Sequence, residues 1–230
     1  MNKITSLLLC LLLAPAVIFA ANFEGKIRFS MKSPQRDQPS FMDYSMKQGF
    51  VRIDITGFDS HSPARTVTSI WDLNKHEIYT LMPEQKMYMV MQTEDLAAMA
   101  QGASPDLQIE KTGETENILG YTATKYLIKD NTHDTTSEVW TADGIGTFIT
   151  SASIFKKHGA MSPIEKELAA RGAFPLRMIS HDSSGAETNR MEVVSIDKSS
   201  LPDDTFTVPS DYHSFSLGSM FGGFGAGKAQ

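Results

Sequence analysis

Cysteine is almost missing from this sequence, which has a single one, Cys10, among 230 residues. Cys10 lies inside an apolar run and follows leucines instead of a small residue, so the sequence does not predict a lipid-attachment site there. Beyond Cys10 the chain can form no disulfide and offers no thiolate ligands for zinc. Its stability has to come from a hydrophobic core, for which ~210 residues are ample.

Clusters of basic residues are missing as well. The 21 lysines and arginines are scattered among 27 aspartates and glutamates, and the net charge is −6 at pH 7. A nucleic-acid-binding surface needs a basic face that neutralises phosphates. We therefore expect no nucleic acid among the partners.

No apolar run in the N-terminal segment is long enough for a membrane span of ~20 residues. Lys3 precedes the run Leu7–Leu13, Pro15 interrupts the apolar stretch after it, and small residues lead to Ala20. Charge, short apolar core and small residues in this order are typical of a secretory signal. The sequence predicts a signal peptide over residues 1–20, no transmembrane span after its cleavage, and a location in the bacterial periplasm. Cleavage is expected after Ala20, with Ala16 and Ala21 as alternatives.

The region from Asn22 to about Pro209 alternates apolar and polar residues with a period of two, which is typical of β-strands with unlike faces. Short connections rich in Asp, Asn, Ser and Gly separate the segments, as in antiparallel hairpins. No alternation of strands with helices indicates a parallel sheet. The predicted strands are residues 26–31, 41–47, 51–55, 66–73, 77–82, 86–92, 107–112, 121–129, 137–141, 176–181, 191–197 and 205–208.

Helices are predicted in two interruptions of this pattern. Thr93 caps a segment that ends at Gly102, with acidic residues in its first turn. The second helix begins with a capping box and a proline at Ser162–Glu165 and ends before Gly172, and residues 151–158 are predicted to form a short helix before it. We expect one mainly β (α+β) domain over residues 21–212. Residues 213–230, rich in Gly and Phe, are predicted to form a flexible tail.

Catalytic and metal-binding motifs are missing too. None of the six histidines forms a His-x-x-x-His or HExxH pattern, and no Gly-x-Ser-x-Gly occurs. Residues 131–134 have the composition of a hairpin turn, and the neighbours His181, Asp182 and Ser183 are too close in sequence for a catalytic relay. The sequence does not exclude a catalytic pair of carboxylates, because two such residues can meet in space from distant positions in the chain. We expect no enzyme, no catalytic residue, no metal and no cofactor.

The predicted strand over residues 86–92 is apolar on both faces. Met87, Met89 and Met91 alternate with Tyr88 and Val90, and methionine adapts to irregular apolar partners. One interpretation is a cavity that receives an acyl chain or an apolar peptide. The other is a strand buried on one side by the sheet core and on the other by the helix after Thr93. The candidate cavity residues are Met87, Met89, Met91 and the two tryptophans Trp71 and Trp140.

Several short motifs, in their order along the chain, resemble an uncharacterised family of exported bacterial domains. They are residues 50–55, 70–72, 78–83, 86–88, 112–115, 118–121, 125–126, 138–140 and 201–209. That family is similar in architecture to the periplasmic lipoprotein carriers LolA and LolB. The resemblance implies a strongly curved antiparallel sheet, an incomplete barrel whose open side is covered by short helices, with an apolar cavity between them. In the carriers the cavity holds lipoprotein acyl chains. The carriers' Arg-Pro element has no counterpart, because Arg52 is followed by Ile53, so no acyl-holding arginine is assigned.

These observations leave three hypotheses for function. The first is a non-catalytic periplasmic binding protein that accepts a lipid, an acyl group or an apolar peptide. The second is an interaction module that docks on an envelope protein through its sheet edge or its Gly/Phe tail. The third is a hydrolase that uses scattered carboxylates.

Overall fold

The computed structural model describes residues 23–58, 65–93, 106–146, 148–149 and 172–215. The signal peptide predicted over residues 1–20 lies outside the described residues. So do residues 94–101 and 151–171, where helices are predicted, and the tail beyond residue 215. The structural statements below concern the described part of the chain.

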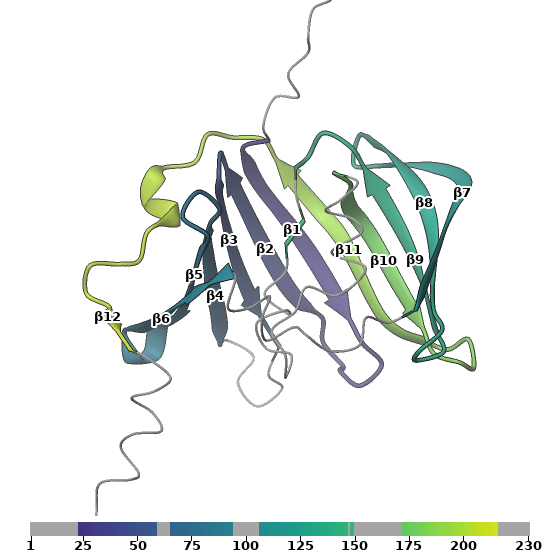
Figure 1. Cartoon of the computed structure of the whole chain (residues 1–230), viewed down its shortest axis with the longest axis horizontal. Coiled ribbons are helices and arrows are strands. Elements are labelled where there is room, and N and C mark those ends of the chain that lie inside the picture. The colour runs from purple at the N-terminus through teal and green to yellow at the C-terminus, as the bar shows by residue number, and fades with distance from the viewer. Residues whose placement is uncertain (1–22, 59–64, 94–105, 147, 150–171, 216–230) are drawn as a thin grey trace, which may run out of the picture.

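Twelve strands form one sheet in the order β12-β6-β5-β4-β3-β2-β1-β11-β10-β9-β8-β7 (Figure 1). Neighbouring strands are antiparallel, except that β12 runs parallel to β6. The strands are β1 Gly25–Lys32, β2 Ser40–Lys47, β3 Phe50–Thr56, β4 Thr66–Asp72, β5 Glu77–Met82, β6 Met87–Gln92, β7 Leu107–Ile118, β8 Tyr121–Asp130, β9 Thr135–Ala142, β10 Phe174–His181, β11 Glu187–Asp197 and β12 His213–Ser214. The sheet curves but does not close, since β12 and β7 lie at its two ends (Figure 1). The predicted curved antiparallel sheet, an incomplete barrel, is confirmed.

The sheet consists of two meanders. Strands β1 to β6 pair in sequence order, and so do β7 to β11. The pairing of β1 with β11 joins them, with Ile27 opposite Ile196 and Met31 opposite Met191. The N-terminal strand of the domain therefore lies in the middle of the sheet.

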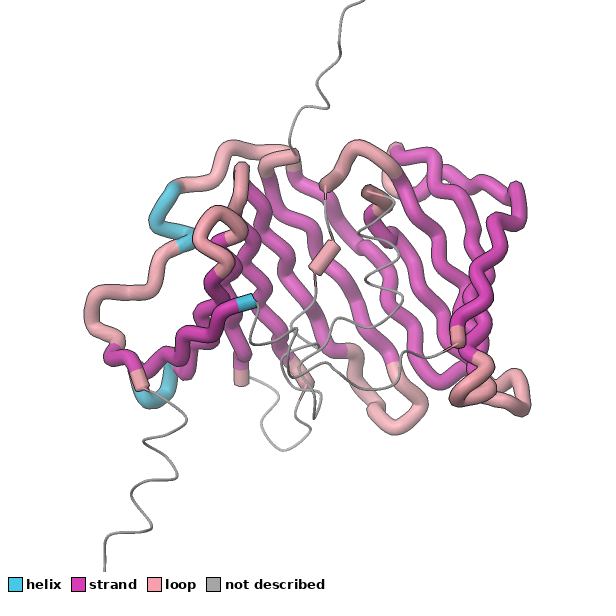
Figure 2. The backbone as a smooth tube through the Cα atoms, in the orientation of Figure 1, coloured by secondary structure: helices cyan, strands magenta, loops and turns pink. Residues whose placement is uncertain are grey.

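Two elements differ from the sequence prediction. The predicted strand over residues 205–208 is absent: its first two residues end a 3-10 turn, η2 (Asp203–Phe206), and its last two lie in irregular structure after that turn (Figure 2). Phe206 is buried by the turn itself. The alternation of apolar residues at positions 206 and 208 therefore resembles a strand pattern although no strand forms. His213 and Ser214, the first residues of the predicted tail, form β12.

The main core lies on one face of the sheet. Alternate residues of β1, β2 and β3 point to this core face, as a strand's period of two requires. Its centre is aromatic: Tyr44 stacks on Phe148 at 5.9 Å between ring centroids, and Phe174 meets both rings edge-on. The buried residues on these three strands are Ile27, Phe29, Met42, Tyr44, Met46, Val51 and Ile53.

A second hydrophobic cluster lies on the opposite face, over β3 to β6. Ile70 of β4 and Leu81 of β5 are buried there beneath Leu201 and Phe206. The ring of Phe206 lies 5.8 Å from that of Phe50. Lys47 holds the segment in place, because its Nζ donates to the Leu201 carbonyl at 2.6 Å. The segment around η2 therefore covers the outer face of the first meander.

Candidate ligand-binding face

The three methionines of β6 point to the core face. Their partners across the ladder are Ile78 for Met91, Thr80 for Met89, and Met82 for Met87. Since Ile78 is buried in the main core, the register places the whole row on that face. All three methionines are half-buried, and Met91 packs against the core. The row is thus the margin of the core face and not its centre.

The other face of β6 is apolar for a different reason. Tyr88 packs on the second cluster, with its ring 6.2 Å from that of Tyr79. Val90, two residues on, is 39% exposed. The strand therefore separates two apolar regions, as its composition predicts, although neither side buries it fully.

Trp71 lies near the methionine row. It is opposite Val51 and Ile78, so only Ile78 separates it from Met91 across the sheet. It is 5% exposed, and its indole Nε1 donates to Ser69 Oγ at 3.3 Å. Trp71 is therefore a core residue, in the cluster against which Met91 packs.

Trp140 lies farther along the sheet than Trp71. It lies on β9, in the second meander, opposite Arg177 and Lys125. Both cations lie over its ring, at 5.8 Å and 5.7 Å from the centroid. The sequence cannot distinguish this tryptophan from Trp71, because both occupy alternating positions of apolar strands. In the structure Trp140 is on β9 and Trp71 on β4, yet both belong to the same hydrophobic core cluster, and the cavity role of Trp140 stays a prediction.

A pocket of about 310 Å³ adjoins the methionine row at the end of β4 and β5. Thr80 and Met82, which line it, are the ladder partners of Met89 and Met87. The Thr80 hydroxyl is buried and has no hydrogen-bond partner among the described residues. The full lining is Arg65, Thr66, Val67, Thr80, Leu81, Met82, Pro83, Glu84 and Gln85. Sequence reasoning missed these residues, although the turn after Met82 already implies that Met82 faces Met87.

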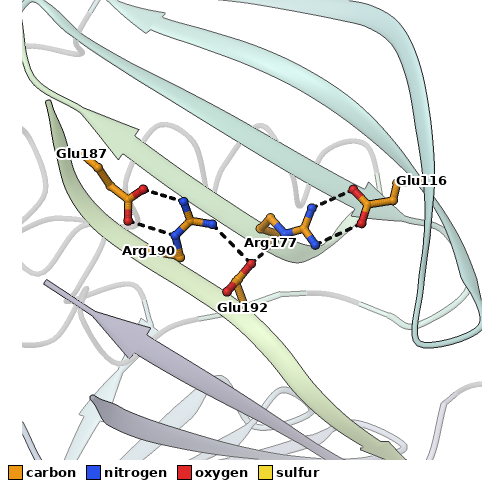
Figure 3. A network of polar contacts seen from close by, with 5 residues as sticks. All are labelled: Glu116, Arg177, Glu187, Arg190 and Glu192. Carbon is orange, nitrogen blue, oxygen red and sulfur yellow. Dashed lines mark hydrogen bonds and ion pairs between the residues drawn. The ribbon is translucent and has the colours of Figure 1, made fainter. Parts of the chain in front are cut away.

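A network of five charged residues crosses the second meander (Figure 3), and its Arg177 is opposite Trp140 on the adjacent strand. Arg177 donates to both carboxylate oxygens of Glu116, at 2.7 and 3.1 Å, and to Glu192 at 2.8 Å. Arg190 joins Glu192 to Glu187. The two-pronged pairing matches the planar guanidinium to the carboxylate. The network links β7, β10 and β11.

These contacts favour the ionised form of Glu116 and Glu187. The hydrogen bonds from Arg177 lower the pKa of Glu116, and those from Arg190 lower the pKa of Glu187. Among the described carboxyl groups with a shifted pKa, every shift is downward. A general acid needs the opposite shift. The network consists of ion pairs that cross strands at Arg177 and run along β11 at Arg190.

Two segments that were considered from the sequence as metal-binding or catalytic sites are turns in the structure. Residues 131–134 connect β8 to β9, and His133 Nδ1 lies 2.7 Å from Asp130 Oδ2 within that turn. Asp182 Oδ1 accepts hydrogen bonds from the Ser184 and Ala186 amides, which fixes the β10–β11 turn. In the described ranges no three His, Cys, Asp or Glu side chains gather as a metal site would require. The described part of the chain also has no helix long and apolar enough to cross a membrane.

By its fold the protein is an open, curved β-sheet domain with its main core on one face and a smaller hydrophobic cluster on the other. Residues 23–212 match the family model described as a domain of unknown function, DUF4412, and the chain belongs to this family. The uncharacterised family expected from the sequence motifs is thereby confirmed. No curated protein matches the chain.

Solved structures with a similar arrangement share little sequence with it. An uncharacterised conserved protein from Thermus thermophilus has 10% identity over 84% of this chain and 90% of its own, with a TM-score of 0.48. In the Pseudomonas aeruginosa MucA/MucB complex, a chain with 11% identity is matched over 84% of this chain and 58% of its own, with a TM-score of 0.43. A domain assigned to outer membrane lipoprotein sorting from Vibrio parahaemolyticus has 7% identity over 80% and 88%, with a TM-score of 0.32.

Proposed function

We propose that this protein is a non-catalytic periplasmic binding protein that accepts a lipid, an acyl group or an apolar peptide segment on its core face. The periplasmic location rests on the predicted signal over residues 1–20. The binding role rests on the methionine row of β6 and the pocket beside it.

The observation that carries the proposal is the half-burial of Met87, Met89 and Met91 next to a pocket. A residue that only fills a core is buried, as Ile78 is on the adjacent strand. Half-buried thioethers beside open space can instead adjust to an apolar guest of variable shape. Each CH₂ that such a guest buries contributes about 0.8 kcal/mol.

The polar end of a guest has a partner as well. Thr80 and Arg65 both line the pocket, and the Thr80 hydroxyl has no hydrogen-bond partner within the described ranges. A buried hydroxyl without a partner destabilises the free protein, and a ligand oxygen that pairs with it removes that cost. An amphiphile with an apolar chain and a polar or anionic end fits this combination.

The test compares Met89→Glu with Met89→Leu. Glutamate places a charge among apolar side chains, where it has no partner, and should abolish binding of a fluorescent fatty-acid probe. Leucine keeps the volume and polarity and should retain it. Far-UV circular dichroism of both variants should match the wild type. Unchanged probe binding by a folded Met89→Glu protein would place the ligand elsewhere, and loss of the fold would make the row part of the core.

A further inference from the structure

The two edges of the open sheet are built differently. An edge strand presents unpaired N–H and C=O groups, and proteins usually protect it with charged side chains or bulges. β7 follows this rule: it carries Glu110, Lys111, Glu114 and Glu116, and its ladder with β8 is interrupted between Lys111 and Thr115. Gly113 allows the positive φ of 82° at this bulge.

At the other end of the sheet, the two-residue strand β12 pairs only with Met87 and Tyr88 of β6, and the rest of β6 has neither charged residues nor a bulge. Its sequence from Met87 to Gln92 contains no charged residue. Its ladder with β5 is unbroken from the pair Met82 and Met87 to the pair Glu77 and Gln92. A regular, uncharged and apolar edge is the kind that accepts another strand.

The structure shows which backbone groups face this edge. His213 N donates to Lys86 O, and Phe215 N donates to Tyr88 O, both at 2.9 Å. Backbone groups alternate sides along a strand, so the even-numbered residues of β6 face the edge and the methionines face β5. The next groups in the row belong to Val90 and Gln92. Among the described residues, pairing along this edge ends at Phe215.

β12 also shows how an added strand lies. His213 is opposite Met87, so it points to the same face as the methionines, and Ser214 is opposite Tyr88. Phe215, the next residue on the methionine side, is half-buried, whereas Ser214 is exposed. Alternate side chains of a strand that continues along the edge in this register would fall beside Met89 and Met91.

We infer that the edge of β6 at Val90 and Gln92 receives an extended, uncharged segment of a partner protein, which adds to the sheet as a strand. Its backbone pairs with Val90 and Gln92, and its apolar side chains, at every second position, cover Met89 and Met91. This inference rests on the proposed function and specifies its guest as a peptide. Two observations support the inference: the edge continues the ladder that β12 begins, and β6 has no charged residue and no bulge.

The experiment removes one edge N–H without touching the β5 ladder. Val90→Pro deletes that donor, and Val90→Thr keeps it at the same exposed position. The probe is a fluorescein-labelled hexapeptide that alternates serine with phenylalanine and leucine, and fluorescence anisotropy with the full mature chain reports binding. We expect Val90→Pro to weaken binding about ten-fold and Val90→Thr to change it less than about two-fold. If Val90→Pro does not fold, Gln92→Pro removes the next edge donor, with the same expected loss.

The fatty-acid probe separates this inference from the proposed function. Loss of peptide binding by Val90→Pro with unchanged fatty-acid binding supports the edge as a separate contact. A wild-type protein that binds the fatty acid and not the peptide overturns the inference and leaves the proposed function standing. Peptide binding that appears only in Leu217→Asp would also overturn it, because the chain's own C-terminal segment would then be the occupant. Concentration-dependent dimers of the wild type that Val90→Pro abolishes would make a second copy the occupant and overturn it as well.

Discussion

Two buried tyrosine hydroxyls allow a controlled test of the core. Tyr44 is fully buried, and its hydroxyl oxygen accepts a hydrogen bond from the Ile149 backbone N–H at 2.8 Å. Tyr121 has a buried hydroxyl with no partner among the described residues. Tyr→Phe removes one oxygen at either position and leaves the ring in place. The two substitutions therefore make the same chemical change. They differ in whether a hydrogen-bond donor loses its acceptor.

Tyr44→Phe leaves the amide of Ile149 buried without its acceptor. A buried donor that loses its partner costs about 1–3 kcal/mol. Tyr121→Phe removes a hydroxyl that already lacks a partner, so we expect no loss or a small gain in the free energy of unfolding. For a chain of this length, each kcal/mol lost lowers the melting temperature by about 2–4 °C. Urea titration and calorimetry of the two variants measure the difference. Equal losses for both variants would refute the reasoning, because the partner at Ile149 would then contribute nothing.

Two further predictions concern the polar network and the outer cluster. Because Arg177 and Arg190 lower the pKa of Glu116 and Glu187 in the folded state, their contribution to stability is present above the unfolded value of 4.5 and is lost as the pH falls through the lower folded values. Urea midpoints measured between about pH 7 and pH 3 should therefore fall at the acid end, less steeply in Glu116→Gln; an identical slope in that variant would contradict the assignment. Phe206→Ala should cost about 3 kcal/mol, because Phe206 is buried over β3 and its ring contacts Phe50. The exposed neighbour Thr207 provides the control, and a Phe206→Ala protein as stable as Thr207→Ala would mean that the second cluster does not hold the sheet.

Most strands could be predicted from the sequence, because one face of the sheet is buried. The predicted strand over residues 77–82 coincides with β5, since Ile78 and Leu81 are apolar and turn residues bound the segment. The sequence predicts β7 only to residue 112, because Gly113 is typical of a strand end; the structure passes it through a bulge. β10 begins at Phe174 rather than at residue 176, because Pro175 lies where the ladder is irregular and a proline is tolerated.

The candidate site was predictable only in part. The alternation of Met87, Met89 and Met91 already places them on one face of a strand. It does not show which tryptophan lies near them, because that depends on the order of strands in the sheet. The pocket depends on register across the β5–β6 turn, which brings Thr80 beside Met89. β12 has no signal of its own, since two residues are too few for a pattern.

The position of β1 in the middle of the sheet has a consequence for how the chain reaches its fold. The first meander can form from local hairpins, but the ladder between β1 and β11 needs a strand that begins only at Glu187. Pairing between such distant segments is slow, and N-terminal segments are synthesised first. Until β11 arrives, β1 is itself an unprotected edge, with Ile27 and Phe29 facing an incomplete core. A nascent chain that lacks β11 thus exposes the edge of β1, and the completed fold covers this edge with β11.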